Sequence, residues 1–122
     1  MAQHNQLGKE GERLAKIYLL NKGHVILEEN WRCGKIEVDL ISDDGQLIVL
    51  TEVKTRSTKE FGNPEEAVDE DKELSMINAA DIYLRNLNLD VEVRFDIISV
   101  IIEKENVEIN HIEDAFTANY LQ

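Results

Sequence analysis

Two neighbouring apolar stretches joined by a short polar turn constrain the fold of this chain more than any other feature. Residues 36–42 read IEVDLIS, and residues 47–56 read LIVLTEVKTR. Residues of this β-branched and apolar kind favour strands, and the Asp-Asp-Gly-Gln sequence at residues 43–46 is a strong hairpin signal. The sequence therefore predicts a hairpin of two strands around which the rest of the chain is organised.

Charged side chains interrupt both predicted strands at positions that the hairpin would bring together. Because strand side chains alternate between faces, Glu52 and Lys54 share one face, while Val38 and Leu40 lie opposite Asp39. Pairing across the turn would bring Asp39 close to Glu52, with Lys54 nearby. Two carboxylates and a lysine can form a site for a hard divalent cation. The alternative is a solvated hairpin surface, but aspartate is unusual within an apolar strand.

Further helices and strands are predicted on both sides of this hairpin. Apolar residues at helical spacing, followed by Gly23, predict a helix over residues 7–21. Other predicted elements are strands over residues 24–30, 90–103 and 107–109 and a final helix over residues 111–122. The element order α-β-β-β-α-β predicts an α/β fold in which helices flank a mixed β-sheet.

A second long helix is predicted from Asn63 to about Leu87. Asn63 is suited to cap the helix, Pro64 to its first position, and Glu66 completes a capping box. Apolar residues at helical spacing predict the face that packs on the sheet, namely Ala67, Leu74, Ile77, Ala80, Leu84 and Leu87.

Length and composition predict one soluble, cytoplasmic domain. With 122 residues the chain can bury a sizeable core. No apolar run approaches the about 20 residues of a membrane-spanning helix, and the N-terminus lacks the pattern of a secretory signal. Cys33 is the single cysteine, which excludes an internal disulfide and fits a reducing cytoplasm.

The net charge of −12 is distributed unevenly along the chain. Residues 1–59 contain nine basic and nine acidic side chains, whereas residues 60–102 contain three basic and eleven acidic side chains. Phosphate binding is driven by basic patches. We therefore expect weak, salt-sensitive nucleic-acid binding through the first half of the chain, with DNA favoured over RNA, and the acidic remainder suits a protein partner.

Five motifs occur in order along residues 7–102. They are Gly11-Glu12, residues 37–41 (EVDLI), residues 52–56 (EVKTR), residues 61–68 (FGNPEEAV) and residues 94–96 (RFD). Together they resemble the YraN-like family of uncharacterised bacterial proteins, which is similar to the restriction-endonuclease-like superfamily, the PD-(D/E)xK nucleases. The resemblance implies a nuclease-like core over residues 7–102, followed by a C-terminal tail over residues 103–122.

The resemblance also implies roles for individual side chains. It adds Glu12 to Asp39 and Glu52 as a ligand of Mg²⁺ or Mn²⁺, and it makes these three carboxylates and Lys54 the candidate catalytic residues. Lys54 would orient a water molecule or stabilise the charge that develops on the phosphate. The candidate substrate-binding residues are Arg32, Arg56, Lys59 and Lys72.

Three classes of function are consistent with the sequence. The leading hypothesis is a metal-dependent, endonuclease-like protein that acts on nucleic-acid phosphodiesters. The alternative is a catalytically weak or inactive accessory or binding module in nucleic-acid processing. The negative charge supports this alternative, as does Ser75, because the family often has a basic residue three positions after Lys72. A purely structural protein is the third class, and the intact Glu52-x-Lys54 pattern argues against it.

Overall fold

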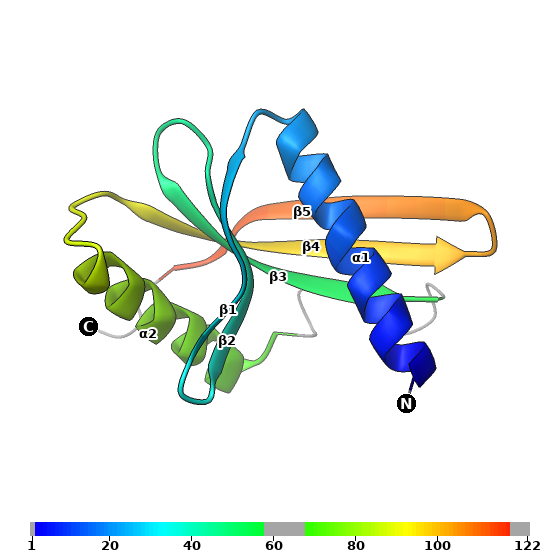
Figure 1. The fold of residues 1–122 in the computed structure, drawn as a ribbon, viewed down its shortest axis with the longest axis horizontal. Helices are drawn as coiled ribbons and strands as arrows, with labels where there is room; N and C mark the ends of the chain where they lie inside the picture. Colours follow the sequence, from blue (N-terminus) through cyan, green and yellow to red (C-terminus); the bar gives the residue numbers. More distant parts are fainter. Residues whose placement is uncertain (1, 58–67, 118–122) are drawn as a thin grey trace.

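A five-stranded mixed sheet forms the body of the protein in a computed structural model that describes residues 2–57 and 68–117 (Figure 1). The elements are α1 (Ala2–Asn21), β1 (Val25–Cys33), β2 (Ile36–Asp43), β3 (Ile48–Arg56), α2 (Glu70–Asn86), β4 (Val93–Glu103) and β5 (Asn106–Phe116). The strands lie in the order β1-β2-β3-β4-β5, with β3 and β4 parallel and the other neighbours antiparallel. The predicted α/β fold with a mixed sheet and flanking helices is confirmed, and β5 extends it.

Each face of the sheet has its own hydrophobic core. The core on the α2 side includes Val38, Leu50, Met76, Phe95 and Ile97, and the core on the α1 side includes Ala15, Leu19, Leu40, Ile98 and Val100. Strand β4 supplies alternate residues to both cores. Strand β2 departs from the prediction, because Val38 and Leu40 lie in different cores although they are two residues apart. The two residues that flank Asp39 therefore pack on opposite faces of the sheet.

Helix α1 crosses in front of β3 and β4 (Figure 1). Its predicted apolar stripe is confirmed, because Leu7, Leu14, Ala15, Tyr18 and Leu19 are buried or partly buried. A Cβ atom on Gly11 would lie 1.8 Å from Thr55 Oγ1, so this close approach to β3 requires glycine. Gly23 follows the helix with a φ of 95°, as predicted for a C-terminal cap. Neither α1 nor any other helix of the described residues is long and apolar enough to cross a membrane.

Helix α2 begins later than predicted. Its N-cap is Asp69, whose side chain accepts a hydrogen bond from the N–H of Lys72 at 2.9 Å. Because Val68 and Asp69 are not helical, the prediction of one continuous helix from Asn63 is wrong. The predicted capping residues 63–66 lie outside the described residues. Aspartate is as good an N-cap as asparagine, so the sequence contains two competing start signals.

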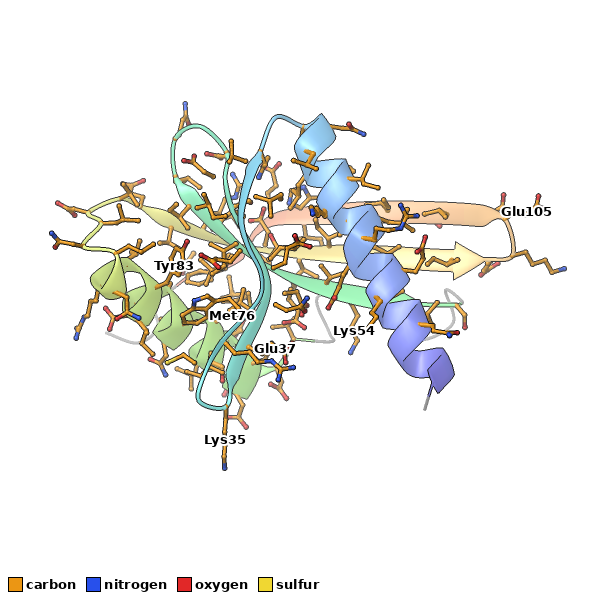
Figure 2. All side chains as sticks on the ribbon, in the orientation of Figure 1. Lys35, Glu37, Lys54, Met76, Tyr83 and Glu105 are labelled. Atoms are coloured by element: carbon orange, nitrogen blue, oxygen red, sulfur yellow. The ribbon has the colours of Figure 1, made fainter. Side chains whose placement is uncertain are left out.

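The face that α2 packs on the sheet is shifted from the predicted one, although predicted Ala80 is buried and Ile77 and Leu84 pack against the α2-side core. The buried residues are Met76, Ala79, Ala80 and Tyr83, which follow the i, i+3, i+4, i+7 pattern of one helix face. Figure 2 shows Met76 and Tyr83 between α2 and the β1–β2 hairpin. Leu87, which was predicted to face the sheet, is 52% exposed.

Strand β5 occupies the first half of the predicted final helix. The predicted strand over residues 107–109 lies inside β5, but the predicted helix over residues 111–122 is wrong as far as Phe116. The end of that range lies outside the described residues. Ile112, Ala115 and Phe116 have helical spacing and all pack on the α2-side core. They do so from a strand because the register between β4 and β5 shifts near them.

Candidate functional site

The candidate site lies where β2 and β3 separate. Their antiparallel pairing ends at Leu40 and Thr51, and the next residues along the two strands are Asp39 and Glu52. Asp39 Oδ2 accepts a hydrogen bond from the backbone N–H of Val53 at 2.8 Å. The carboxylate of Asp39 thus binds a backbone N–H of β3 that lies beyond the last backbone pair between β2 and β3. In Figure 1 the β1–β2 hairpin turns away from β3, so the two strands form a fork.

Glu52 meets Lys72 on the α2 side of this fork. Leu50 belongs to the α2-side core, and Glu52, two residues further along β3, shares its face. Lys72 Nζ lies 3.0 Å from Glu52 Oε2 and donates a hydrogen bond to the carbonyl oxygen of Glu37 at 3.2 Å. The side chains of Glu52 and Lys72 are only 17% and 32% exposed, so their ion pair is partly shielded from water. Lys72, predicted to bind substrate, therefore contacts a predicted metal ligand.

Glu12 approaches Asp39 from α1. The close contact between Gly11 and Thr55 holds this part of the helix against β3, and Glu12 is the next residue. Burial raises the pKa of Glu12, and the neighbouring charge of Asp39 raises it further. Asp39 therefore interacts with Glu12 as well as with Glu52. We call Glu12, Asp39, Glu52 and Lys72 the fork site.

The carboxyl groups of the fork site have raised pKa values because they are buried near one another. Burial raises the pKa of Asp39 despite the opposing effects of the Val53 N–H and the Lys72 ammonium. Burial and then the charge of Asp39 raise the pKa of Glu52 to about 7, against the opposing effect of Lys72. The fork site thus contains more negative charge than its surroundings stabilise, which is a feature of functional sites as well as of strained ion-pair networks.

The other predicted site residues lie outside this set of contacts. Lys54 is exposed on β3 (Figure 2), and its ammonium forms no ion pair with a described residue. Arg32, whose side chain is 70% exposed, lies 3.5 Å from a carboxylate oxygen of Glu37. Arg56 is half-buried at the end of β3, and Lys59 lies outside the described residues.

The oxygen donors of the fork site suit a hard divalent cation, although they do not form a closed cage. Mg²⁺ commonly binds one or two carboxylates and keeps several water molecules. Asp39 and Glu52 supply two carboxylates, and a positive charge from Lys72 already lies beside one of them. Among the described residues, no three His, Cys, Asp or Glu side chains form a group that could hold a metal ion. The fork site therefore offers a cation no more than two protein ligands, with Glu12 at the border.

A second polar cluster, which the sequence analysis did not predict, lies between β4 and β5. Asp96 is fully buried and accepts hydrogen bonds from Arg94 Nε at 2.8 Å and Nη2 at 2.9 Å. His111 Nε2 lies 2.6 Å from Asp96 Oδ2, and the N–H of Asp114 donates to Oδ1 at 3.1 Å. Lys22 Nζ faces His111 Nδ1 at 3.3 Å. Because an ammonium can only donate, Nδ1 accepts and Nε2 carries the proton that binds Asp96.

We call Arg94, Asp96, His111 and the N–H of Asp114 the Asp96 brace. Burial alone would raise the pKa of Asp96, but the hydrogen bonds from His111, Arg94 and Asp114 outweigh it and hold this pKa below its ordinary value. The side chain of His111 is only 2% exposed, so the brace is closed to a substrate. The signal in the sequence was an aspartate inside the apolar run RFDIISV, the same signal that singled out Asp39.

Proteins with similar sequences span nearly the whole chain. A UPF0102 protein of Christiangramia forsetii is 50% identical over 116 residues, which cover 95% of this chain and 98% of the relative. UPF0102 proteins of Bacteroides thetaiotaomicron and Phocaeicola vulgatus are 48% and 47% identical, each over 95% of this chain and 96% of the relative. The profile of the family described as "Uncharacterised protein family UPF0102" matches residues 11–100, which include the fork site and the Asp96 residue of the brace. The chain therefore belongs to the UPF0102 family.

Proposed function

We propose that this UPF0102 protein is a metal-dependent, endonuclease-like protein with a restriction-endonuclease-like core, acting on nucleic-acid phosphodiesters. The observation that carries the proposal is the meeting of Asp39 and Glu52 where β2 and β3 separate, with raised pKa values at both carboxyl groups. Buried carboxylates that repel each other are stabilised by a cation of higher charge than a single lysine.

The position of each side chain suggests its task. Asp39 and Glu52 would hold Mg²⁺ or Mn²⁺, and Glu12 would bind the cation directly or through water. A cation bound there supplies charge neutralisation at the phosphate and lowers the pKa of a nearby water molecule. Lys54 is more exposed than Glu52 along the same strand, so its ammonium is available to orient water or to stabilise charge on the phosphate oxygens.

A cleavage assay with matched variants tests this proposal. Wild-type protein should cleave a panel of single-stranded, duplex and branched DNA or RNA at low salt with Mn²⁺ or Mg²⁺, and excess chelator should abolish cleavage. Glu52→Gln should reduce the rate by a factor of about 10² to 10³, as expected for loss of a group that stabilises the reacting charge. Glu70→Gln, on the exposed first turn of α2, changes the net charge equally and is the control. Equal cleavage by Glu52→Gln and wild type would contradict the assignment.

Substrate binding should depend on basic residues from the first half of the chain. Arg32→Glu and Arg56→Glu should weaken nucleic-acid binding and flatten its dependence on salt, because each basic contact releases counterions. Arg85→Glu is the control, because Arg85 has a 79% exposed side chain but lies in the acidic segment. Fluorescence anisotropy of labelled DNA and RNA at several salt concentrations measures both effects. An equal loss in Arg85→Glu would show that binding does not use the predicted region.

A second candidate function is a binding module that does not turn over its ligand. The net charge of −12 favours it, because a strongly acidic protein repels nucleic acid and attracts basic protein surfaces. Metal binding by the fork site without cleavage of any substrate in the panel would support this second function.

A further inference from the structure

Lys72 reaches Glu52 from the first turn of α2, whose backbone is held by a helix cap. The side chain of Asp69 caps this helix by accepting the N–H of Lys72, which fixes the backbone of the first turn. The other charged residues of the turn, Glu70, Asp71 and Glu73, are acidic. Lys72 is thus the basic residue of an acidic turn, and it points its ammonium at Glu52 rather than leaving it in solvent.

The contacts of Lys72 place a single positive charge beside carboxylates that need one. Its ammonium lies 3.0 Å from Glu52 Oε2 and 3.2 Å from the carbonyl oxygen of Glu37. Lys72 also favours the ionised form of Asp39. An ammonium compensates only part of the charge of two neighbouring carboxylates, whereas a divalent cation matches it.

We propose that Lys72 is an internal counter-ion that leaves Glu52 when a divalent cation binds at the fork site. This inference rests on the proposed function, because it assumes that Glu52 is a metal ligand. A magnesium ion binds a carboxylate oxygen at about 2.0–2.1 Å, close enough to exclude an ammonium from the same oxygen. The metal also repels the ammonium, and the four-carbon stem of lysine allows Nζ to swing away without moving α2. Lys72 therefore stabilises the metal-free protein and lowers its affinity for metal.

We call this replacement of the Lys72 ammonium by a metal ion beside Glu52 the exchange. Metal binding by variants that lack one lysine charge tests it. Lys72→Met keeps most of the stem and removes the ammonium. Lys35→Met removes the same charge from an exposed lysine at the tip of the β1–β2 hairpin (Figure 2), away from the fork site. Mn²⁺ binding would be measured by calorimetry at about pH 8, above the pKa of Glu52 of about 7, so that protons compete less with the metal. We expect Lys72→Met to bind Mn²⁺ about tenfold more tightly than wild type, because no charged hydrogen bond has to break. Lys35→Met should bind as wild type does.

A measurement on the wild-type protein guards against misfolding of the variant. The side-chain ammonium of Lys72 can be followed by nitrogen NMR and assigned with Lys72→Arg. Addition of diamagnetic Mg²⁺ should shift this signal toward that of a free lysine, while the signal of Lys35 stays unchanged. An unchanged Lys72 signal at saturating Mg²⁺ would overturn the exchange.

The outcomes separate the inference from the proposed function. If wild type binds Mn²⁺ and Lys72→Met binds it no more tightly, the exchange would be overturned and the nuclease proposal would stay intact. Binding by Lys72→Met but not by wild type would support the exchange in its strongest form. No binding of Mn²⁺ by wild type or by either variant would overturn both.

Discussion

Asp39 on β2 and Asp96 on β4 are both aspartates inside apolar strands, but their carboxylates have different neighbours. Asp96 accepts hydrogen bonds from Arg94, His111 and the N–H of Asp114, and its pKa is lowered. Asp39 accepts the N–H of Val53 and lies near the Lys72 ammonium and the carboxyl groups of Glu12 and Glu52, and burial raises its pKa. Hydrogen-bond donors outweigh the effect of burial in the Asp96 brace, whereas in the fork site the Val53 N–H and the Lys72 ammonium do not outweigh burial and the neighbouring carboxylates.

This difference shows how burial of the same residue type can serve two purposes. A buried carboxylate with a full set of donors ties strands together, because removing it would leave those donors without a partner. A buried carboxylate next to other carboxylates reduces stability until a cation binds. The number and sign of the neighbours, rather than burial itself, therefore separate a structural acid from a candidate functional one.

The largest expected effect is the loss of stability in Asp96→Asn compared with Asp39→Asn. Asp96→Asn should lower the free energy of unfolding by about 3–5 kcal/mol, the usual cost of removing one partner of a buried pair. Asp39→Asn should be as stable as wild type or more stable, because it relieves repulsion and its amide oxygen still accepts the N–H of Val53. Urea unfolding with excess chelator measures both. Equal losses in the two variants would mean that Asp39 is also a structural brace.

The next effect concerns metal, which should act on the fork site alone. A cation that binds only the folded protein should stabilise it by about 2.7 kcal/mol at a hundredfold excess over the dissociation constant. Asp39→Asn should lose most of this gain. Asp96→Asn, starting from a lower melting temperature, should retain it. Thermal melts of the three proteins in chelator and in excess Mn²⁺ provide the measurement, and equal gains in wild type and Asp39→Asn would show that Asp39 is not a ligand.

The pH dependence of stability should have opposite signs at the two clusters. The pKa of Glu52 is raised from 4.5 to about 7 on folding. The folded protein therefore binds the proton of the Glu52 carboxyl group more tightly than the unfolded chain does. The stability that this protonated group contributes is lost as the pH rises from about 4.5 to about 7. The pKa of Asp96 is lowered from 3.8, so its contribution is present above that pH and is lost as the pH falls through its folded-state pKa.

Glu52→Gln isolates the contribution of the fork site to this pH dependence. The variant should gain stability relative to wild type by about 2 kcal/mol between about pH 4.5 and pH 7.5. This is less than the whole shift would give, because Glu52 and Asp39 titrate as a pair. Urea unfolding in chelator at several pH values provides the measurement, with Glu70→Gln as control. A constant difference between Glu52→Gln and wild type over this range would contradict the raised pKa.

The smallest effect tests whether the seating of α1 supports the fork site. Gly11→Ala should cost about 1–2 kcal/mol, because its Cβ would overlap Thr55 and force α1 away from β3. The same variant should weaken Mn²⁺ binding if Glu12 borders the metal. Gly8→Ala is a matched control with no atoms near its Cβ, and it should be neutral or stabilising by up to about 1 kcal/mol. Equal stability changes in both variants would show that the contact with Thr55 can relax at little cost.

The sequence predicted the hairpin and the neighbourhood of Asp39 and Glu52 because both depend on local patterns. Alternation, turn residues and loop length set the register of a hairpin, and the observed pairing of Leu40 with Thr51 places the two carboxylates one step further along. The final strand was predicted partly as a helix, because a register shift between β4 and β5 disguised its alternation. The face of α2 was predicted only in part, because its apolar residues form two overlapping helical faces that share Ala80.

By itself, the sequence determined the first four strands and the carboxylates that lie near the central hairpin, because side-chain periodicity and turn chemistry act over a few residues. The tertiary structure alone decided that Lys72, rather than Lys54, contacts Glu52, and that His111 meets Asp96 across a bulge. Those contacts depend on how α2 and β5 pack against the whole sheet. That packing follows from the sum of many buried contacts distributed over the chain, and no short stretch of sequence specifies it.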